Sequence, residues 1–195
     1  MQNLKDTAGI IATLLVFLGY IPYLRDVIGG RTKPHIYSWF VWGIVTLIAF
    51  ALQVSDFAGI GSLVTLAAGL MCFIVIALGV VYKSKVKITR IDTIFLILSL
   101  IALVLWLFVK EPVLSAILVA IIGLLGFVPT IRKSWNNPYS ETLSFYLLNT
   151  LRFLLNVFSL RHYSIITALY PITWLMINGL FAFTLVVRRK QLHKF

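Results

Sequence analysis

The sequence predicts an all-α integral membrane protein with seven transmembrane helices. Hydrophobic residues make up 61% of the 195 positions and charged residues only 12%, whereas soluble domains are roughly half apolar and a quarter charged. The charges form short clusters between long uncharged stretches, and a helix needs about 20 mostly apolar residues to cross a bilayer. Too little polar side chain is present to coat a water-soluble core, so we expect a bundle of membrane-spanning helices.

Seven stretches meet this length requirement. The first follows a segment with a single lysine and has no small-residue cleavage signature, so we expect a retained helix and not a signal peptide. The connections are short, and several turn on glycine, proline or asparagine, such as Gly29-Gly30 and Asn136-Asn137-Pro138. The predicted spans are, in order, Thr7–Leu24, Ile36–Val54, Ala58–Tyr82, Thr93–Val109, Pro112–Ile131, Thr142–Leu160 and Ser164–Val187.

The basic residues predict the orientation of these spans, because lysine and arginine concentrate on the cytoplasmic side. One side carries only 3 of them, namely Lys5, Lys110 and Arg161. The other side carries 13, namely Arg25, Arg31, Lys33, Lys83, Lys85, Lys87, Arg90, Arg132, Lys133, Arg188, Arg189, Lys190 and Lys194. We therefore expect the protein in the cell membrane with its N-terminus outside and its C-terminus in the cytoplasm.

An internal repeat divides the chain. Phe17–Arg25 aligns without gaps on Leu124–Arg132, and four of the nine pairs are identical. Each copy ends its span and runs into a basic turn, and Ser38-Trp39 then falls opposite Ser144-Phe145. Spans one to three thus repeat as spans five to seven, in parallel orientation because one extra span separates them. The predicted units are a first three-helix repeat (1–84), a linker helix with its basic loop (85–110) and a second repeat with a basic tail (111–195).

This three-plus-one-plus-three pattern, with Gly-x-x-Pro before a basic turn in both repeats, resembles the PQ-loop and SWEET-like superfamily of sugar and amino-acid transporters. Tyr23 and Thr130 stand where that motif has its glutamine. The resemblance implies a central pocket beneath tryptophan and asparagine side chains, and Asn178 matches one such asparagine. A weaker resemblance leads to a vitamin-precursor transporter family. Microbial rhodopsins are excluded, because the seventh span has no lysine to carry retinal.

Prolines inside three spans are candidate hinges. A helical proline cannot donate a hydrogen bond to the carbonyl four residues back, and its ring crowds that carbonyl, so the helix bends. Pro22 and Pro129 occupy matching positions of the repeat, each three residues after a glycine, Gly19 or Gly126. Pro171 lies in the seventh span. We expect these five residues to act in gating, although glycine and proline are also common in membrane helices for packing reasons.

Arg152 is the most informative single residue, because it lies in the middle of the sixth predicted span. Asn149 and Asn156 lie three residues before it and four after it, on one helical stripe. A charge at this depth indicates function by default. Two interpretations stay open: a structural arginine bonded to backbone carbonyls or to Asn178, and an arginine in a watery cavity that meets an anionic or polar substrate group. Tyr146 is a weaker candidate on the same helix.

Tryptophans complete the predicted pocket. Trp42 is expected to point into the bundle, and Trp174 lies one turn before Asn178, where it would form the opposite wall. Aromatic faces with a few amide groups suit neutral sugars, nucleosides or amino acids. His35 and Trp39, near the basic end of the second span, are expected at the membrane interface.

These residues predict a transporter that moves a small polar solute (a sugar, amino acid, nucleoside or organic acid) by alternating access, facilitative or ion-coupled. Catalytic carboxylate pairs, histidine clusters and phosphate-binding loops are missing from the sequence pattern, so we expect no enzyme, no cofactor, no metal and no nucleic-acid partner. The expected partners are the solute and the lipid bilayer. The path fits within one chain, and a homodimer stays open. The alternatives are a receptor or scaffold that binds a peptide or lipid without transport, and a lipid-handling protein.

Overall fold

The computed structural model describes residues 2–82, 86–108 and 111–192, and the described chain is helical throughout apart from short connections. Several residues used to predict the spans and their orientation, namely Met1, Lys83, Lys85, Val109, Lys110 and Lys194, lie outside this part. The helices are α1 (Gln2–Ile28), α2 (Ile36–Ser55), α3 (Gly61–Val81), α4 (Arg90–Leu107), α5 (Pro112–Asn136), the short 3-10 helix η1 (Pro138–Ser140), α6 (Leu143–Ser159) and α7 (Ile165–Leu192).

The all-α class and its membrane character agree with the prediction. Five helices, α1, α2, α3, α5 and α7, are long and apolar enough to cross a membrane. The other two α-helices of the described chain, α4 and α6, contain 18 and 17 residues and are not in this set. Large apolar side chains such as Leu14, Val104 and Phe183 face outward, about half or more exposed. Lipid is the solvent that such a surface fits.

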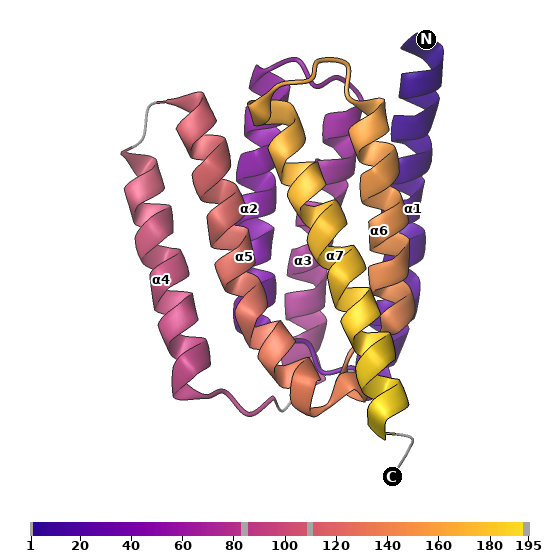
Figure 1. Ribbon diagram of the computed structural model, residues 1–195, viewed down its shortest axis with the longest axis vertical. Helices are drawn as coiled ribbons and strands as arrows, with labels where there is room; N and C mark the ends of the chain where they lie inside the picture. Colours follow the sequence, from indigo (N-terminus) through magenta and orange to yellow (C-terminus); the bar gives the residue numbers. More distant parts are fainter. Residues whose placement is uncertain (1, 83–85, 109–110, 193–195) are drawn as a thin grey trace.

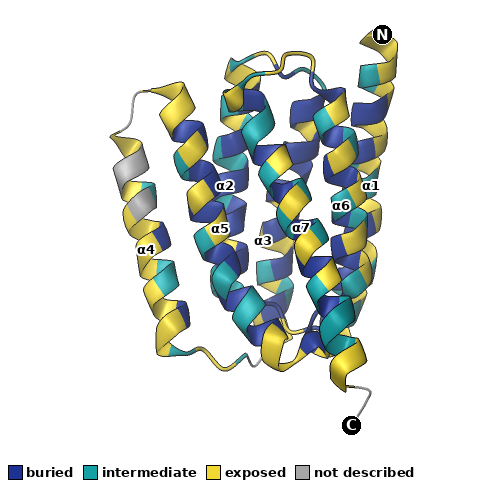
Figure 2. Cartoon of the chain, viewed as in Figure 1, coloured by how far each residue is buried: buried dark blue, intermediate teal, exposed yellow. Residues whose placement is uncertain are grey.

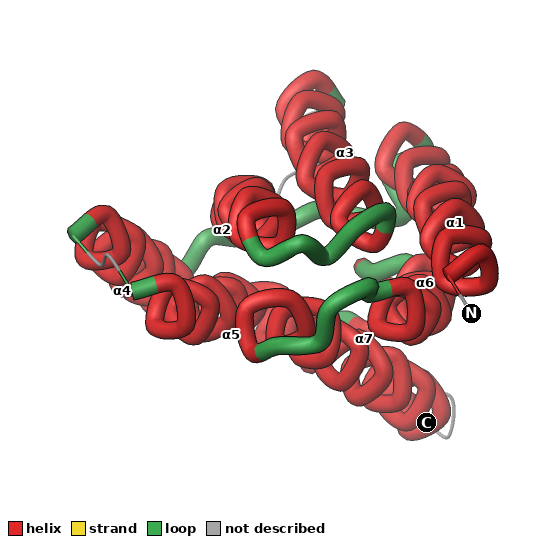
Figure 3. The backbone as a smooth tube through the Cα atoms, turned by 90° about the horizontal axis from the view of Figure 1, so that it is seen from above, coloured by secondary structure: helices red, strands yellow, loops and turns green. Residues whose placement is uncertain are grey.

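The helices form two facing groups. We call α1, α2 and α3 the first triplet and α5, α6 and α7 the second triplet. Within the first triplet α3 packs against both α1 and α2, and within the second α7 packs against both α5 and α6. Between the triplets, α1 packs against α6 and α2 against α5 (Figures 1 and 3). Helix α4 lies outside, mainly against α5, and is exposed along much of its length (Figure 2).

Three helices extend further than predicted. Helix α1 continues to Ile28, α5 to Asn136 and α7 to Leu192, so Arg25, Arg132 and Lys133 lie in helices and not in turns. Arg188, Arg189 and Lys190 are likewise helical and do not form a tail. Cations are favourable in the last turns of a helix, where the carbonyl ends of the backbone dipoles accumulate negative charge. Charge therefore marks the edge of the apolar span but not the end of the helix.

A glycine allows the close contact between the triplets. A Cβ atom on Gly126 of α5 would lie 2.8 Å from a side-chain carbon of Val41 on α2, which is too close for real atoms. One turn earlier, the indole nitrogen of Trp42 donates to the carbonyl oxygen of Gly123 at 3.1 Å. The predicted role of Gly126 at a bend is thus accompanied by a packing role, which places α2 directly against α5.

Candidate functional site

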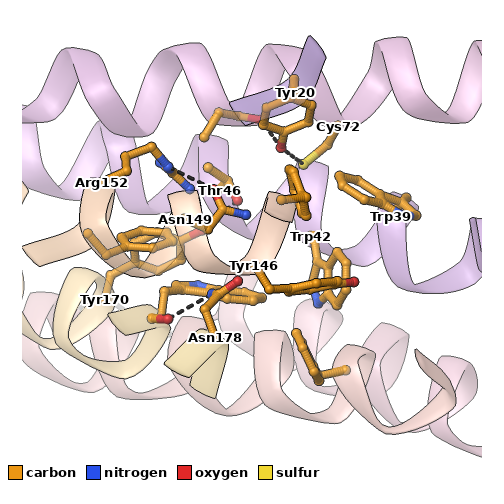
Figure 4. Close-up of a pocket in the computed structure, with 15 residues that line it drawn as sticks. Tyr20, Trp39, Trp42, Thr46, Cys72, Tyr146, Asn149, Arg152, Tyr170 and Asn178 are labelled. Atoms are coloured by element: carbon orange, nitrogen blue, oxygen red, sulfur yellow. Dashed lines mark hydrogen bonds between the residues drawn. The ribbon is translucent and has the colours of Figure 1, made fainter. Parts of the chain in front are cut away.

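A central cavity lies between the two triplets, lined by side chains from all six of their helices. It offers about 40 Å³ to the centres of water-sized spheres, which is room for a few water molecules. Its walls are mostly aromatic, with a small number of amide, hydroxyl and guanidinium groups (Figure 4). This is the composition of ligand sites in general, which combine apolar walls with a few placed polar groups.

Equivalent positions of the predicted repeat both contribute to the lining of this cavity. The lining residues include several pairs that occupy matching positions of the two triplets, at an almost constant sequence offset: Tyr20 and Phe127, Trp39 and Phe145, Thr46 and Arg152, Ala68 and Trp174, and Cys72 and Asn178. The first triplet contributes no amide and no charge to the cavity, whereas the second contributes Asn149, Arg152 and Asn178. The amide groups and the charge of the site therefore come from the second triplet.

Arg152 is buried in the wall of the cavity, with only 3% of its surface exposed. Its Nε donates to Oδ1 of Asn149 at 3.0 Å, and its guanidinium carbon lies 3.9 Å from the ring centroid of Phe153. Among the residues that the structure describes, its Nη1 has no hydrogen-bond partner. Figure 4 shows Arg152 and Asn149 at one side of the cavity, with Trp39 and Trp42 at the other. Neither structural alternative for Arg152, a backbone carbonyl or Asn178, is among its hydrogen bonds in the described chain.

The predicted tryptophans meet as expected. The rings of Trp42 and Trp174 lie edge to face, with centroids 5.5 Å apart. Phe153 stacks nearly parallel to Trp174, at 6.3 Å and 14°. Asn178 lines the cavity and donates from its amide nitrogen to the carbonyl oxygen of Trp174 at 2.7 Å. Stacked and edge-on rings stabilise one another, so these residues form a rigid wall.

Five of the six predicted binding residues line the central cavity, and Asn156 does not. Asn156 belongs to the buried stripe of α6, as expected, but lies beyond the cavity, close to Gly61 of α3. Neither its amide oxygen nor its amide nitrogen has a hydrogen-bond partner. The buried face of α6 extends beyond the cavity. Asn149, Arg152 and Asn156 therefore share one face of the helix, but only Asn149 and Arg152 line the cavity.

The predicted hinges flank the cavity. Pro22 of α1 follows the lining residue Tyr20 by two positions, and Pro129 of α5 follows Phe127 by two. Pro171 of α7 comes directly after a further lining residue, Tyr170. Pro129 and Pro171 are buried, Pro22 is half-buried, and Gly19 is buried against Leu148 of α6. Bends at these prolines would move the cavity walls directly.

Two residues expected at the membrane interface are instead buried. Trp39 is 2% exposed, lines the cavity and donates from its indole nitrogen to the hydroxyl of Tyr23 at 3.1 Å. His35 is 1% exposed, because α4 covers it and brings Oδ2 of Asp92 within 3.5 Å of its Nε2. The spacing of Trp39 and Trp42, three residues apart on one helical face, is a signal that could have identified Trp39 as a cavity residue.

Several residues that line the cavity are not predicted from the sequence, or are predicted only as weaker candidates. Tyr146 is almost fully buried and lines the cavity, although it was the weaker candidate. The hydroxyls of Thr46 and Tyr170 lie 2.6 Å apart across the triplet interface, and the hydroxyl of Tyr20 lies 3.8 Å from the sulfur of Cys72. Aromatic residues are common throughout these apolar spans, so composition alone did not single out the ones that face inward.

The basic end of the bundle closes the cavity on one side. This end comprises the connections α1–α2, α3–α4 and α5–α6 together with the C-terminal end of α7. Lys133 Nζ donates to Oε1 of Glu141 and to the carbonyl oxygen of Lys33, each at 2.5 Å. The hydroxyls of Thr32 and Thr142 lie 2.6 Å apart. The bond from Lys133 to Lys33 and the contact between Thr32 and Thr142 join the first triplet to the second, whereas the Lys133–Glu141 pair lies within the second.

The opposite end, which comprises the N-terminus and the connections α2–α3 and α6–α7, is closed as well. Gln53 Nε2 donates to the carbonyl oxygen of Thr167 at 3.1 Å, and Arg161 forms an ion pair with Asp6 at 2.9 Å. Ser164 Oγ donates to Asp56, again between triplets. In the described conformation, contacts between the triplets therefore lie at both ends of the cavity.

Comparison of this chain with models of protein families, with characterised proteins and with solved structures finds no match. In residues 2–82, 86–108 and 111–192, no three His, Cys, Asp or Glu side chains are grouped so as to hold a metal ion. The residues gathered at the cavity can bind and orient a small ligand through a guanidinium, two amides and stacked rings.

Proposed function

We propose that the chain is a membrane transporter that moves a small polar solute by alternating access. The single observation that supports this most is the central cavity, which lies between two similarly arranged triplets and has contacts that cross the triplet interface at both of its ends. Breaking the contacts at one end while keeping those at the other would expose the cavity to one side of the membrane. That is the geometry alternating access requires.

The proposal includes the full seven-span architecture. Helices α4 and α6 would cross the membrane alongside the five longer helices, and α4 would link two parallel three-helix repeats. The neighbour relations support this, because each contact in the first triplet has a counterpart in the second, and α1–α6 corresponds to α5–α2. The resemblance of the two Gly-x-x-Pro segments to the PQ-loop and SWEET-like superfamily supports the same arrangement.

In this mechanism the two triplets rock against each other about the cavity. The prolines Pro22 and Pro129, with Pro171, would let the ends of α1, α5 and α7 move while their other halves stay packed. A solute larger than a few water molecules would bind only after the triplets separate at one end, because the closed cavity is small. Closure around the solute would then commit it to crossing.

Flux into proteoliposomes tests the proposal. Purified protein is reconstituted, and uptake of labelled sugars, amino acids, nucleosides and organic acids is measured with and without an ion gradient. We expect saturable uptake of at least one class, and loss of that uptake in Trp174→Ala, which removes a cavity wall. The matched control is Trp135→Ala, at an exposed tryptophan outside the cavity. Specific binding without any flux would instead establish the receptor or scaffold alternative.

The proposed orientation has its own test. The basic end should face the cytoplasm, with the C-terminus inside and the N-terminus outside. A reporter that is active only in the cytoplasm should work when it is fused after Phe195 and stay silent when it is fused before Met1. The reverse pattern would overturn the orientation but leave the transport proposal intact.

A further inference from the structure

We infer that the central cavity binds a small carboxylate with one net negative charge, and that the guanidinium of Arg152 neutralises it. This inference rests on the proposed function and names its substrate class. The aromatic and amide residues alone suggest a neutral sugar, nucleoside or amino acid, whereas the charge of Arg152 favours an anion.

Arg152 is the buried charged side chain that has no ion-pair partner in the described part of the chain. Within residues 2–82, 86–108 and 111–192, the buried aspartate, glutamate, lysine and arginine residues are Asp92, Lys133, Glu141 and Arg152. Asp92 pairs with Arg132 at 2.5 Å, and Lys133 pairs with Glu141 at 2.5 Å. Arg152 has no ion pair in the described chain, and no acidic side chain lines the cavity. An uncompensated buried charge is costly, and an anionic ligand would remove that cost.

The donors of Arg152 are available to such a ligand. A guanidinium has five N–H groups and no acceptor, so the Asn149 atom that faces Nε must be the amide oxygen. This bond uses Nε and leaves Nη1 unpartnered. The amide nitrogen of Asn149 has no hydrogen bond within the described chain, and Asn149 lines the cavity beside Arg152. Arg152 and Asn149 together thus present several donors at one place, and a carboxylate, which accepts through two oxygens, matches them.

The rest of the cavity limits the ligand to one negative charge. The other lining residues are aromatic, amide, hydroxyl, thiol or aliphatic, and none is a second cation. A dianion would therefore carry one buried charge without a partner. The cavity in its closed form is small, and its stacked rings around Trp174 and Phe153 favour an apolar or planar body. A small monocarboxylate satisfies all of these conditions.

Paired ligands test this inference on the unmodified protein. Thermal unfolding of detergent-purified protein is measured with acetate and acetamide, lactate and lactamide, and benzoate and benzamide, at constant ionic strength. A ligand that binds the folded state raises the melting temperature by mass action. We expect stabilisation by at least one acid and not by its amide. Equal stabilisation by acid and amide, or by no acid of the panel, would overturn the inference.

Variants locate the site. Arg152→Gln should weaken binding of the stabilising acid by about tenfold to a hundredfold, the range for hydrogen bonds to charged groups, and Arg152→Lys should restore part of it. Arg90→Gln is the matched control, since Arg90 is exposed on α4, outside the cavity and away from the contacts between the triplets, and it should bind as the unmodified protein does. Unchanged affinity in a folded Arg152→Gln protein would contradict the inference. If that variant does not fold, the acid and amide pairs still decide the question.

Flux separates this inference from the proposed function. If the stabilising acid binds at Arg152 but is not transported into proteoliposomes, the transport proposal fails and the carboxylate site stands. If a neutral solute is transported and no acid competes with it, the transport proposal stands and the carboxylate site fails.

Discussion

The two ends of the bundle are closed by different kinds of contact. At the basic end the Lys133–Glu141 pair is deeply buried, with side-chain exposures of 9% and 0%, and Tyr146 donates its hydroxyl to the second oxygen of Glu141 at 3.0 Å. At the opposite end the Arg161–Asp6 pair has side-chain exposures of 40% and 24%. Figure 1 shows these ends at the two extremes of the helices, with the C-terminus at the basic end and the N-terminus at the other.

This difference indicates which end opens more easily. Separating the triplets at the basic end takes the carbonyl oxygen of Lys33 away from the buried ammonium of Lys133, and losing a hydrogen bond to a buried charge is costly. At the opposite end an exposed ion pair exchanges its partner for solvent at little cost. The opposite end should therefore open first from the closed conformation. The predictions below test the contrast between the ends, beginning with the largest expected effect.

Glu141→Gln should destabilise the protein most. The change leaves the buried ammonium of Lys133 without its counter-charge, and removing one partner of a buried pair costs about 3–5 kcal/mol. Unfolding in detergent, followed by circular dichroism, measures the loss. Cys72, the only cysteine, is buried in the cavity wall, so its rate of maleimide labelling should rise as the basic end loosens.

The double variant Glu141→Gln with Lys133→Met is the control for this explanation. It removes both charges, so it should recover most of the lost stability. If the double variant is as unstable as the single one, the cost does not come from the unpaired lysine.

Pro129→Ala should mainly reduce the movement of the basic end of the bundle. Restoring a helical hydrogen bond in α5 should raise the free energy of unfolding, by up to about 3 kcal/mol, while flux slows because the basic end moves less freely. Pro22→Ala, at the matching position of α1, is the comparison. Pro129 is buried and Pro22 half-buried, so we expect the larger effect at Pro129. Normal flux in the double variant would reduce both prolines to packing residues.

The basic end should also weaken at low pH. Burial lowers the pKa of His35 below its ordinary value, although Asp92 opposes this shift, and the positive charges of Lys133 and Arg132 add to it. A depressed pKa means that the unfolded chain takes up the proton first, so this stability is complete above the ordinary value near 6.5 and is lost as pH falls below it. Melting temperatures between pH 8 and 5 should fall less steeply in His35→Gln than in the unmodified protein.

The control for this titration is His162→Gln, at the opposite end, where the histidine side chain is 56% exposed. Its melting curve should parallel that of the unmodified protein over the same range. Parallel curves for His35→Gln as well would show that the pH dependence arises elsewhere.

Arg161→Gln should have the smallest effect on stability, about 0–1 kcal/mol, because exposed ion pairs contribute little. It should nevertheless ease opening at the opposite end, since Arg161 bridges to α1 through Asp6. Labelling of Cys72 by an impermeant maleimide added from that side of the membrane measures this. A loss of stability as large as that of Glu141→Gln would remove the contrast between the ends.

The sequence alone determined the class of fold and the positions of the helices. A long apolar stretch between charged clusters has few alternatives to a membrane helix, because every backbone polar group must be paired inside the segment. The predicted spans accordingly fall on the seven α-helices, with ends that differ by several residues where arginine and lysine continue α1, α5 and α7. The central position of Arg152 in its helix and the matching positions of Pro22 and Pro129 could also be inferred from the sequence alone.

The tertiary structure decided which faces of these helices meet. In a soluble helix an apolar stripe marks the core, but lipid is as apolar as a protein interior, so the pattern does not separate the two. That is why Trp39 and His35 were expected at the interface and are buried, and why Asn156 shares a stripe with Arg152 but lies outside the cavity. The Lys133–Glu141 pair likewise depends on how the connection after α5 folds back onto that helix. Helix order can be inferred from local composition, whereas these contacts exist only once the triplets have packed.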